Sequence, residues 1–474
     1  MKRHVFAAAL VLFAGLAAPA LAQEATPRGV QLPPYEINTL GNGAVLMLME
    51  KHDTPLVSMS AVVRGGALGD PAGKEGSAAL LAELIQKGAG SRDAAAFAEA
   101  IESVGGELAA SSGTESIGLG ASFLARDVGL MVELVADALI RPRFDPAEFA
   151  KVRTLAIQSI AAAKDADPRD LIGTYGDAWL FQGHPYGRPV GGSERSLEGV
   201  LLDDVKSYYA AQTGGDRLIL TVVGDFRAAD MKQRLGAAFG DWRKAGAAVP
   251  AAAAMAAVQG RRVLLIDKPG ATQTYFWLGN VGASRTDPAR AAQTLVNTVF
   301  GGRFTSMLNT ELRIKSGLSY GASSGFDRLS QPASFQIASF TQTDKTAAAV
   351  DLALATLDRL HAEGLNADAL ASAKNYVLGQ FPPTIETNGQ LAGRLADMVF
   401  FGLGPEDVNE YAKRVAAVDA GTVKATIERD FPVSGELAIV LIGDAAEIRD
   451  SAKKYGPVAE MKITDPTFAP PAAP

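Results

Sequence analysis

The stretch GSAALLAELIQKG, at residues 76–88, has the form of a helix that could carry a metal site. Ala79 and Glu83 stand four residues apart, and side chains at this spacing project from one face of a helix, where two of them can bind one ion. The stretch contains no histidine, and Glu83 alone fits a solvated helix face equally well. The helix therefore has the spacing of a metal site without its ligands.

Histidine is scarce in this chain, and cysteine is absent. Beyond the first residues, the histidines are His52, His184 and His361, and no two of them lie within one hundred residues of each other. His52 and His184 stand in turn-like segments, EKHDTP and GHPYG, where a lone histidine is usually a surface residue. A local histidine pair is impossible, and thiolate sites, thiol catalysis and disulfides are excluded. We expect this chain to hold no catalytic zinc.

The chain repeats itself at the scale of a domain. A buried apolar strand ends in Gly-Asp at Gly224 and again at Gly443, 219 residues later. Asp-Pro turns at Asp70 and Asp287 lie 217 residues apart, each after two strand-like stretches and before an amphipathic helix. A unit of this length has the size of a domain. We predict an α+β fold with two homologous domains, each a largely antiparallel sheet packed with helices, which together form a clamp.

The first residues have the form of a secretory signal. MKRH is followed by an apolar run of 14 residues and by small residues at Ala20 and Ala22. The run is shorter than the roughly 20 residues that a membrane span needs. We expect a signal peptide at residues 1–22, a periplasmic mature chain in a Gram-negative bacterium, and no membrane anchor after cleavage.

Composition suggests where the domains begin and end. The formal net charge is −7, without clusters of Lys or Arg, which argues against nucleic acid as a partner. The alanine-rich segment before residue 261 is typical of a linker, and the proline-rich end of the chain cannot form a core of its own. The predicted units are an N-terminal domain at 28–243, a linker at 244–260, a C-terminal domain at 261–462 and a disordered tail at 463–474.

Two strand-and-helix halves of this size, with their Gly-Asp strand ends, resemble the pitrilysin family of metallopeptidases. This family includes the insulinase-like and mitochondrial-processing-peptidase-like inverzincins, and the resemblance spans nearly the whole mature chain. In active members the first helix after the opening strands carries H-x-x-E-H, whose histidines bind zinc and whose glutamate activates the metal-bound water.

Against this motif, the histidine positions fall on Ala79 and Glu83 and the glutamate position falls on Ala82. The resemblance therefore implies a degenerate metal site, in which none of these three residues is a ligand. It also implies an acidic ligand about 75 residues further on. There the sequence reads TLAIQSIAAAKD, with Gln158 and Ser159 where acids are expected.

The segment NTELRIKSGLSYGASSG resembles the family pattern L-R-x-x-x-G-L-x-Y. In the family, an arginine and a tyrosine seven residues apart reach the zinc site of the other domain, and the match places them at Arg313 and Tyr320. These donors can hold a scissile carbonyl and stabilise its oxyanion. We expect Arg313 to end a helix, Gly317 to turn the chain, and Tyr320 to open the next strand. Both residues also fit a purely structural role, at a helix end and a strand start.

A second motif lies beside this segment. GASSG, at residues 321–325, fits the G-x-S-x-G pattern of a serine nucleophile elbow, with Ser323 as the nucleophile. That elbow requires a helix directly after the serine. The residues that follow include a proline and then alternate like a strand, which argues against a serine hydrolase.

Some bacterial members of the family work as pairs, in which one chain carries H-x-x-E-H and the other only the arginine and tyrosine. The resemblance implies that this chain is the non-catalytic subunit of a heterodimeric zinc peptidase. It would have no cofactor of its own, and Arg313 and Tyr320 would bind peptide substrate and stabilise the transition state at the partner's zinc. The alternative is a catalytically silent peptide-binding or structural scaffold subunit. A stand-alone peptidase would need a metal site that the sequence lacks.

Overall fold

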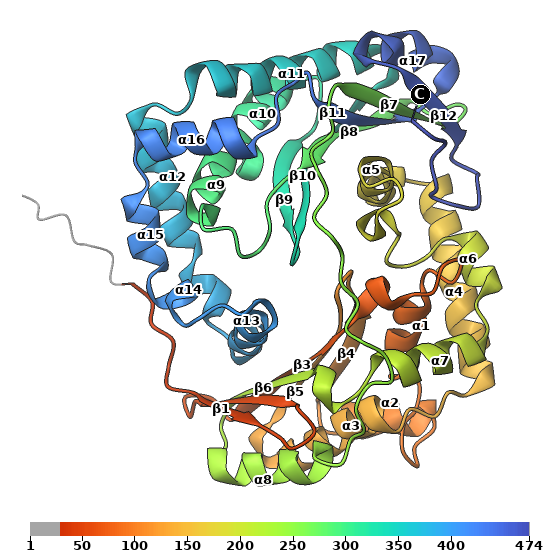
Figure 1. The fold of residues 1–474 in the computed structure, drawn as a ribbon, viewed down its shortest axis with the longest axis vertical. Coiled ribbons are helices and arrows are strands. Elements are labelled where there is room, and N and C mark those ends of the chain that lie inside the picture. Colours follow the sequence, from red (N-terminus) through yellow and green to blue (C-terminus); the bar gives the residue numbers. More distant parts are fainter. Residues whose placement is uncertain (1–28, 474) are drawn as a thin grey trace, which may run out of the picture.

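The computed structural model describes residues 29–473, and the signal peptide predicted at residues 1–22 lies outside them. The chain forms two halves with the same order of elements: opening strands, helices, a hairpin, further helices and a late strand (Figure 1). The first half consists of β1 (Glu36–Thr39), β2 (Val45–Glu50), β3 (Leu56–Arg64), α1 (Ser77–Leu84), α2 (Ala94–Glu102), β4 (Glu107–Ser112), β5 (Ser116–Leu124), α3 (Val128–Ile140), α4 (Pro146–Asp165), α5 (Ile172–Leu180), α6 (Glu194–Gly199), α7 (Leu202–Gln212), β6 (Leu218–Gly224) and α8 (Ala228–Phe239). The second half consists of β7 (Arg261–Asp267), β8 (Gln273–Val281), α9 (Arg290–Asn297), α10 (Met307–Asn309), β9 (Ala322–Arg328), β10 (Pro332–Gln342), α11 (Thr346–Glu363), α12 (Ala367–Gln380), α13 (Asn388–Phe401), α14 (Glu406–Asn409), α15 (Tyr411–Ala417), α16 (Ala420–Asp430), β11 (Leu437–Gly443), α17 (Ala445–Ala452) and β12 (Val458–Lys462).

Each half contains one six-stranded sheet, and five strands have the same order in both; the edge strand differs, since β1 is antiparallel to β2 and β12 is parallel to β7. The strand order is β1-β2-β6-β3-β5-β4 in the first sheet and β12-β7-β11-β8-β10-β9 in the second. Most neighbouring strands are antiparallel, and the parallel pairs are β2 with β6, β7 with β11, and β7 with β12. The prediction of an α+β fold with two homologous, largely antiparallel domains is confirmed.

The central strands carry the repeat seen in the sequence. LILTVVG of β6 and LAIVLIG of β11 are buried at every residue, because both faces of each sheet are covered. Gly224 ends β6 with φ +144°, and a Cβ at this position would lie 2.2 Å from the carbonyl oxygen of Leu56. The glycine of this Gly-Asp strand end is therefore required by the close approach of β3.

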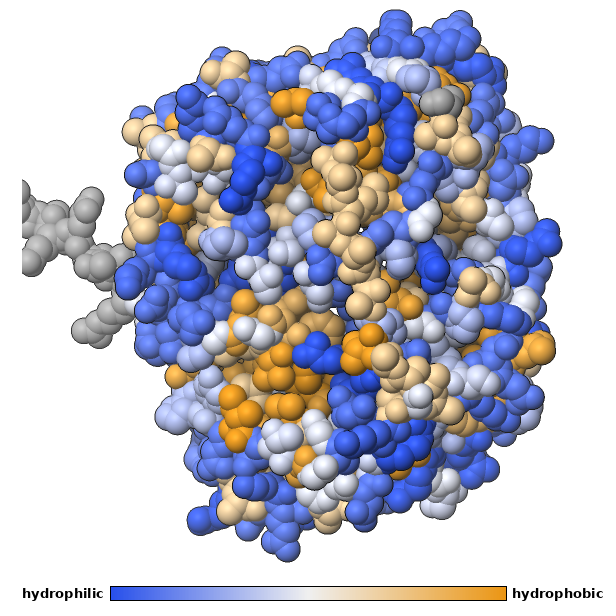
Figure 2. Space-filling model, viewed as in Figure 1, coloured by the Kyte–Doolittle hydropathy of each residue, from blue (hydrophilic) through white to orange (hydrophobic). Residues whose placement is uncertain are grey.

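Two helices are exchanged between the halves. The first half's α5 packs on β8 and β11 of the second sheet, while the second half's α13 packs on β3 and β6 of the first (Figure 1). Trp179 of α5 and Leu395 of α13 are fully buried in these interfaces. Gly176 allows the close approach of α5, since a Cβ there would lie 2.5 Å from the ring of Trp277. On the viewed face, hydrophobic residues gather over α13 and the first sheet (Figure 2).

The segment between the halves contains no helix or strand from residue 244 to residue 260, and β7 begins at Arg261. Among the described residues, none of the helices is both long enough and apolar enough to cross a membrane.

The prediction of a disordered tail at 463–474 is wrong for the residues that the structure describes. Phe468 is only 3% exposed and packs edge-on against Tyr175 of α5, with ring centroids 4.9 Å apart. The Asp465 carbonyl accepts a hydrogen bond from Lys164 Nζ at 2.6 Å. The disorder was predicted from composition, which shows only that the tail cannot form a core by itself. It adds one aromatic ring to a core that other elements supply.

Shortening Leu395 should destabilise the whole protein, because this side chain joins α13 to the sheet of the other half. We expect Leu395→Ala to lower the free energy of unfolding by about 2–5 kcal/mol, measured by urea denaturation. The control is Leu155→Ala, whose side chain is 61% exposed and whose loss should change the free energy by less than about 0.5 kcal/mol. Equal effects of the two substitutions would contradict the packing role of α13.

Candidate functional site

A buried carboxylate fixes the start of helix α1. Asp70 is 4% exposed, and its oxygens accept hydrogen bonds from the backbone amides of Gly76 and Ala78, both at 2.8 Å. Amides in the first turn of a helix have no acceptor within the helix, so Asp70 supplies one. The turn that leads to Ala79 is therefore held in place without any metal.

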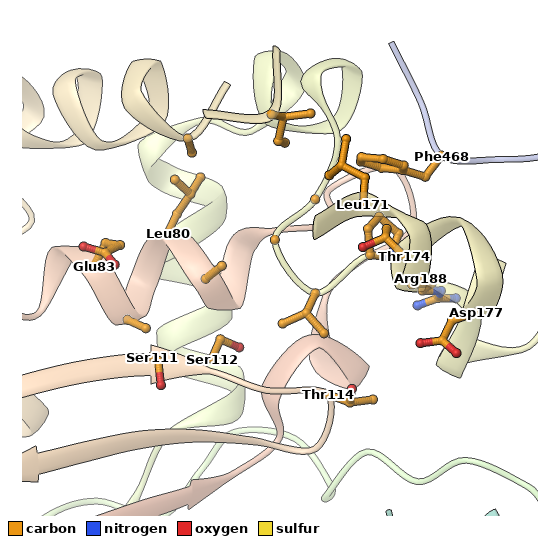
Figure 3. A pocket seen from close by; sticks show the side chains of 18 of the residues that line it. Leu80, Glu83, Ser111, Ser112, Thr114, Leu171, Thr174, Asp177, Arg188 and Phe468 are labelled. Carbon is orange, nitrogen blue, oxygen red and sulfur yellow. The ribbon is translucent and has the colours of Figure 1, made fainter. Parts of the chain in front are cut away.

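The degenerate metal positions line a pocket of about 490 Å³ (Figure 3). Ala79, Ala82 and Glu83 of α1 form part of its wall, together with Val152, Ala156 and Ile160 of α4. Glu83 is exposed, and the two alanines offer no atom that could coordinate an ion. The chemistry of the zinc motif is thus replaced by a mostly apolar surface.

The two residues named for the missing acidic ligand lie outside the pocket. Gln158 and Ser159 are exposed and do not line the pocket. The residues of α4 that line the pocket are Val152, Ala156 and Ile160, and none of them has an acidic side chain.

The three histidines of the described chain serve separate local contacts. His52 is exposed, and hydrogen bonds to Asp225 at 2.7 Å and to Glu50 at 3.3 Å raise its pKa. His184 contacts the carbonyl oxygen of Ala253, and His361 that of Pro432. Within residues 29–473 there is no group of three His, Asp or Glu side chains that could hold a metal ion.

Arg313 and Tyr320 lie together on the second half. The Arg313 guanidinium packs over two aromatic rings, 4.3 Å from the centroid of Tyr320 and 4.9 Å from that of Phe304. Tyr320 is 74% exposed. In the described part of the structure, neither the guanidinium nor the Tyr320 hydroxyl makes a hydrogen bond to another protein group. Their donors are therefore free to bind a ligand.

The local backbone differs from the expectation in two details. Arg313 lies inside a π-helical segment, Thr310–Lys315, rather than at the end of a regular α-helix. Gly317 turns the chain as predicted, with φ +65°, and Tyr320 precedes β9 rather than opening it. A π-helical turn is an uncommon conformation that is often found at functional sites. Here it aligns Arg313 with Tyr320 at the edge of a pocket.

That pocket has a volume of about 600 Å³ and shares no lining residue with the pocket at α1. Its walls include the aromatic rings of Phe304, Phe340 and Tyr376 beside Arg313 and Tyr320. The arginine–tyrosine pair and the degenerate metal positions therefore line different pockets, which approach each other where Leu171 lines one and Ile172 the other.

Ser323 does not form a nucleophile elbow. It lies on β9, paired with Ala338 of β10, and the chain continues into the second strand of a hairpin rather than into a helix. The structure thus agrees with the sequence in excluding a serine hydrolase of this type.

Comparison with known proteins identifies the relatives of this fold and site. Residues 45–194 match the model of the insulinase family, peptidase family M16, and residues 200–377 match that of the peptidase M16 inactive domain. The chain belongs to peptidase family M16. With Ala79, Ala82 and Glu83 at the motif positions, it is an inactive member of that family.

Relatives of this chain occur in several bacteria. The chain is 30% identical over 271 residues to an uncharacterized zinc protease of Mycobacterium leprae, a match that spans 57% of this chain and 61% of that relative. It is 26% identical to an uncharacterized zinc protease of Streptomyces coelicolor, over 75% of this chain and 78% of the relative.

Solved structures share the fold. The structure of a peptidase M16 inactive domain from Pseudomonas fluorescens superposes with a TM-score of 0.80 at 22% identity, covering 86% of this chain and 98% of that one. A protease from Helicobacter pylori gives the same TM-score at 19% identity, covering 87% of this chain and all of that one.

Sequence reasoning missed an acidic group between the two halves of this M16 chain. Asp177 of α5 lines the pocket at α1, and burial, with the charge of Asp327, raises its pKa to about 7. The Ser334 hydroxyl lies 2.9 Å from Asp177 and 2.7 Å from Asp327. One hydroxyl proton cannot serve both carboxylates, which favours protonation of Asp177. No local signal marks Asp177, because Ser334 is 157 residues away in the chain.

The raised pKa of Asp177 predicts a pH-dependent stability. Between its ordinary pKa of 3.8 and about 7 in the folded protein, the folded state binds more protons than the unfolded chain. The contribution of Asp177 to stability therefore falls as the pH rises through this window. Asp177→Asn should flatten the decline in melting temperature between about pH 4 and 7. Asp203→Asn, at a side chain that is 90% exposed, is the control. An unchanged slope in Asp177→Asn would refute this assignment.

The purified chain should carry no stoichiometric zinc, because Ala79 and Ala82 offer no ligand atoms and Glu83 belongs to no group of residues in the described chain that could hold a metal ion. Elemental analysis of a chelator-washed sample measures this directly. A zinc content near one ion per chain would contradict the expectation.

Proposed function

We propose that this chain is the non-catalytic subunit of a heterodimeric, periplasmic zinc metallopeptidase, and that Arg313 and Tyr320 act at the active site of an H-x-x-E-H partner chain. The observation that carries the proposal is that Arg313 and Tyr320 lie in contact and have hydrogen-bond donors without protein acceptors in the described chain. A guanidinium and a phenol lie in contact at the edge of a pocket, with donors that no protein group of the described chain uses.

The geometry suits the binding of a peptide carbonyl. Packing over Phe304 and Tyr320 restricts the Arg313 side chain, so that little ordering is left to occur when substrate binds. A charged guanidinium donates stronger hydrogen bonds than a neutral group, and the Tyr320 hydroxyl adds a second donor nearby. Donors that are already in position stabilise an oxyanion without further rearrangement.

The separation of the two pockets supports action on another chain. The Arg313–Tyr320 pocket does not contain the degenerate metal positions, and the described chain has no group of residues that could bind a zinc ion for the pair to serve. A zinc ion in the partner would supply the activated water for peptide hydrolysis. This chain would bind the peptide, orient its scissile carbonyl and stabilise the negative charge that develops on it.

Two further observations support peptides as the substrate class and the periplasm as the location. Similar chains bear the name zinc protease, which supports peptides as the substrate class. The apolar run at the start of the sequence supports export to the periplasm.

A structural scaffold subunit is the second candidate. The packing of Arg313 over two rings favours it, because the same contacts stabilise the local fold without any substrate. The two candidates differ in what happens to turnover when these side chains are changed.

Arg313→Ala and Tyr320→Phe should lower peptide turnover by the assembled pair while leaving assembly intact. Loss of one oxyanion donor costs about 2.7–4 kcal/mol, or roughly a hundred- to a thousandfold in rate. Arg313→Lys should also be slow, since an ammonium lacks the planar fork of the guanidinium. The measurement is kcat for a peptide with the H-x-x-E-H chain and saturating amounts of each variant.

Two controls separate catalysis from folding. Sedimentation should show a one-to-one complex for wild type and variants, and thermal melting should show that the variants fold. If variants that assemble and melt normally turn over peptide at the wild-type rate, the scaffold function is the correct one. Partner activity that is independent of this chain would overturn the heterodimer altogether.

A further inference from the structure

A group of arginines surrounds a second pocket in the C-terminal half, which the proposed reaction does not use. The pocket has a volume of about 440 Å³ and lies among the start of α9, the end of β9, and helices α12, α13 and α15. The charged residues that line it are Arg285, Arg290, Arg328, Arg394, Asp397 and Asp407. Four guanidinium groups thus face two carboxylates, which leaves a net positive charge around the pocket.

Arg285 is the most deeply buried of these cations. It is 8% exposed, and it donates through Nε to Asp397 at 3.1 Å and through Nη2 to Asp407 at 3.3 Å. Its Nη1 atom is buried and has no hydrogen-bond partner within the described residues. A buried donor without an acceptor is unfavourable. Because Nη1 is closed to solvent, an anion in the pocket would balance the charge of this cluster without bonding to that atom directly.

Two further arginines are incompletely neutralised. Arg328 donates to Gln293 Oε1 at 2.8 Å and to the Ser284 carbonyl oxygen at 3.3 Å, and no ion pair joins it to a carboxylate in the described chain. Burial lowers the pKa of Arg328 to about 10, because its charge is costly there, although Asp287 and Asp430 lie near enough to oppose the shift.

Arg394 lies 3.8 Å from both Asp397 and Asp407, too far for a hydrogen bond. With no other hydrogen bond to its guanidinium in residues 29–473, its donors are available to a ligand.

The rest of the pocket wall is apolar and aromatic. Val377 contributes an aliphatic side chain, and Phe381 stacks on Tyr411 with ring centroids 4.1 Å apart. The volume lies in the range of sites for organic ligands, well above what one inorganic anion would fill. The pocket therefore suits a carboxylate that carries an apolar group beside it.

The place of this pocket beside the Arg313–Tyr320 pocket indicates which carboxylate it would bind. Tyr376 lines both the arginine pocket and the pocket of Arg313 and Tyr320, so the two adjoin. We propose that the arginine pocket binds the C-terminal carboxylate of a peptide whose scissile carbonyl lies at Arg313 and Tyr320. This inference rests on the proposed function for the peptide's position, while the carboxylate site itself can be tested on this chain alone. Guanidinium forks bind carboxylates in two-point contacts, and the apolar wall accepts the last side chain.

The test compares a fluorescent pentapeptide ending in leucine with the same peptide bearing a C-terminal amide. Fluorescence anisotropy with the purified chain measures both dissociation constants, without a partner. The acid should bind roughly 10- to 100-fold more tightly than the amide. Arg394→Gln should weaken acid binding to the level of the amide and leave amide binding unchanged. Arg126→Gln, at a side chain that is 77% exposed, should behave as wild type.

Further variants, and a measurement with inorganic phosphate, separate this proposal from its alternatives. Arg394→Lys keeps the charge without the fork and should retain part of the preference for the acid. Arg313→Ala should keep that preference, so failure of the catalytic proposal would leave this result intact. Equal affinity of wild type for acid and amide, or an undiminished preference in Arg394→Gln, would overturn the carboxylate site. If inorganic phosphate raises the melting temperature while acid and amide bind equally, the pocket takes a small anion and the proposal is wrong.

Discussion

The exchange of α5 and α13 between the two halves is the packing constraint on which the rest of the structure depends. Each helix is covalently part of one half but buries its apolar face on the sheet of the other. Separating the halves would expose Trp179 and Leu395 together with the sheet surfaces that cover them. Such an interface resists hinge opening far more than a polar contact between domains would. The pockets at α1 and at Arg313 are therefore held at fixed positions relative to each other.

Within this packing, helix α1 is held in place although it lacks the metal-binding residues of the motif. Asp70 accepts two amide hydrogen bonds at the start of the helix, and the buried side chains of α1 pack in the core of the first half. None of these interactions depends on Ala79 or Glu83. Small or solvated side chains at the motif positions therefore cost the fold little. What remains at this place is a mostly apolar pocket.

Much of this could be predicted from the sequence, where the signal was local or repeated. The Gly-Asp strand ends at Gly224 and Gly443 identified two equivalent sheets, and the helix predicted from residues 76–88 is present as Ser77–Leu84. The acidic ligand position was misplaced because a spacing of about 75 residues does not fix helical phase. An error of two residues rotates a side chain by about 200° around the helix, and Gln158 and Ser159 lie on the exposed face of α4 while Val152, Ala156 and Ile160 line the pocket. The helix exchange, the burial of Phe468 and the pairing of Asp177 with Ser334 depend on partners far away in the chain, and no local pattern reports them.

The exchange also has a consequence for how the protein is made. Helix α5 ends at Leu180, whereas the strands that cover it, β8 and β11, begin at Gln273 and Leu437. A chain that emerges from its N-terminus onwards therefore presents the Trp179 and Tyr175 rings long before their binding surface exists. The first half cannot complete its burial of apolar surface by itself, and contacts of such long sequence separation form slowly. Until β11 is in place, α5 is an exposed apolar helix, which a growing chain must keep from aggregating.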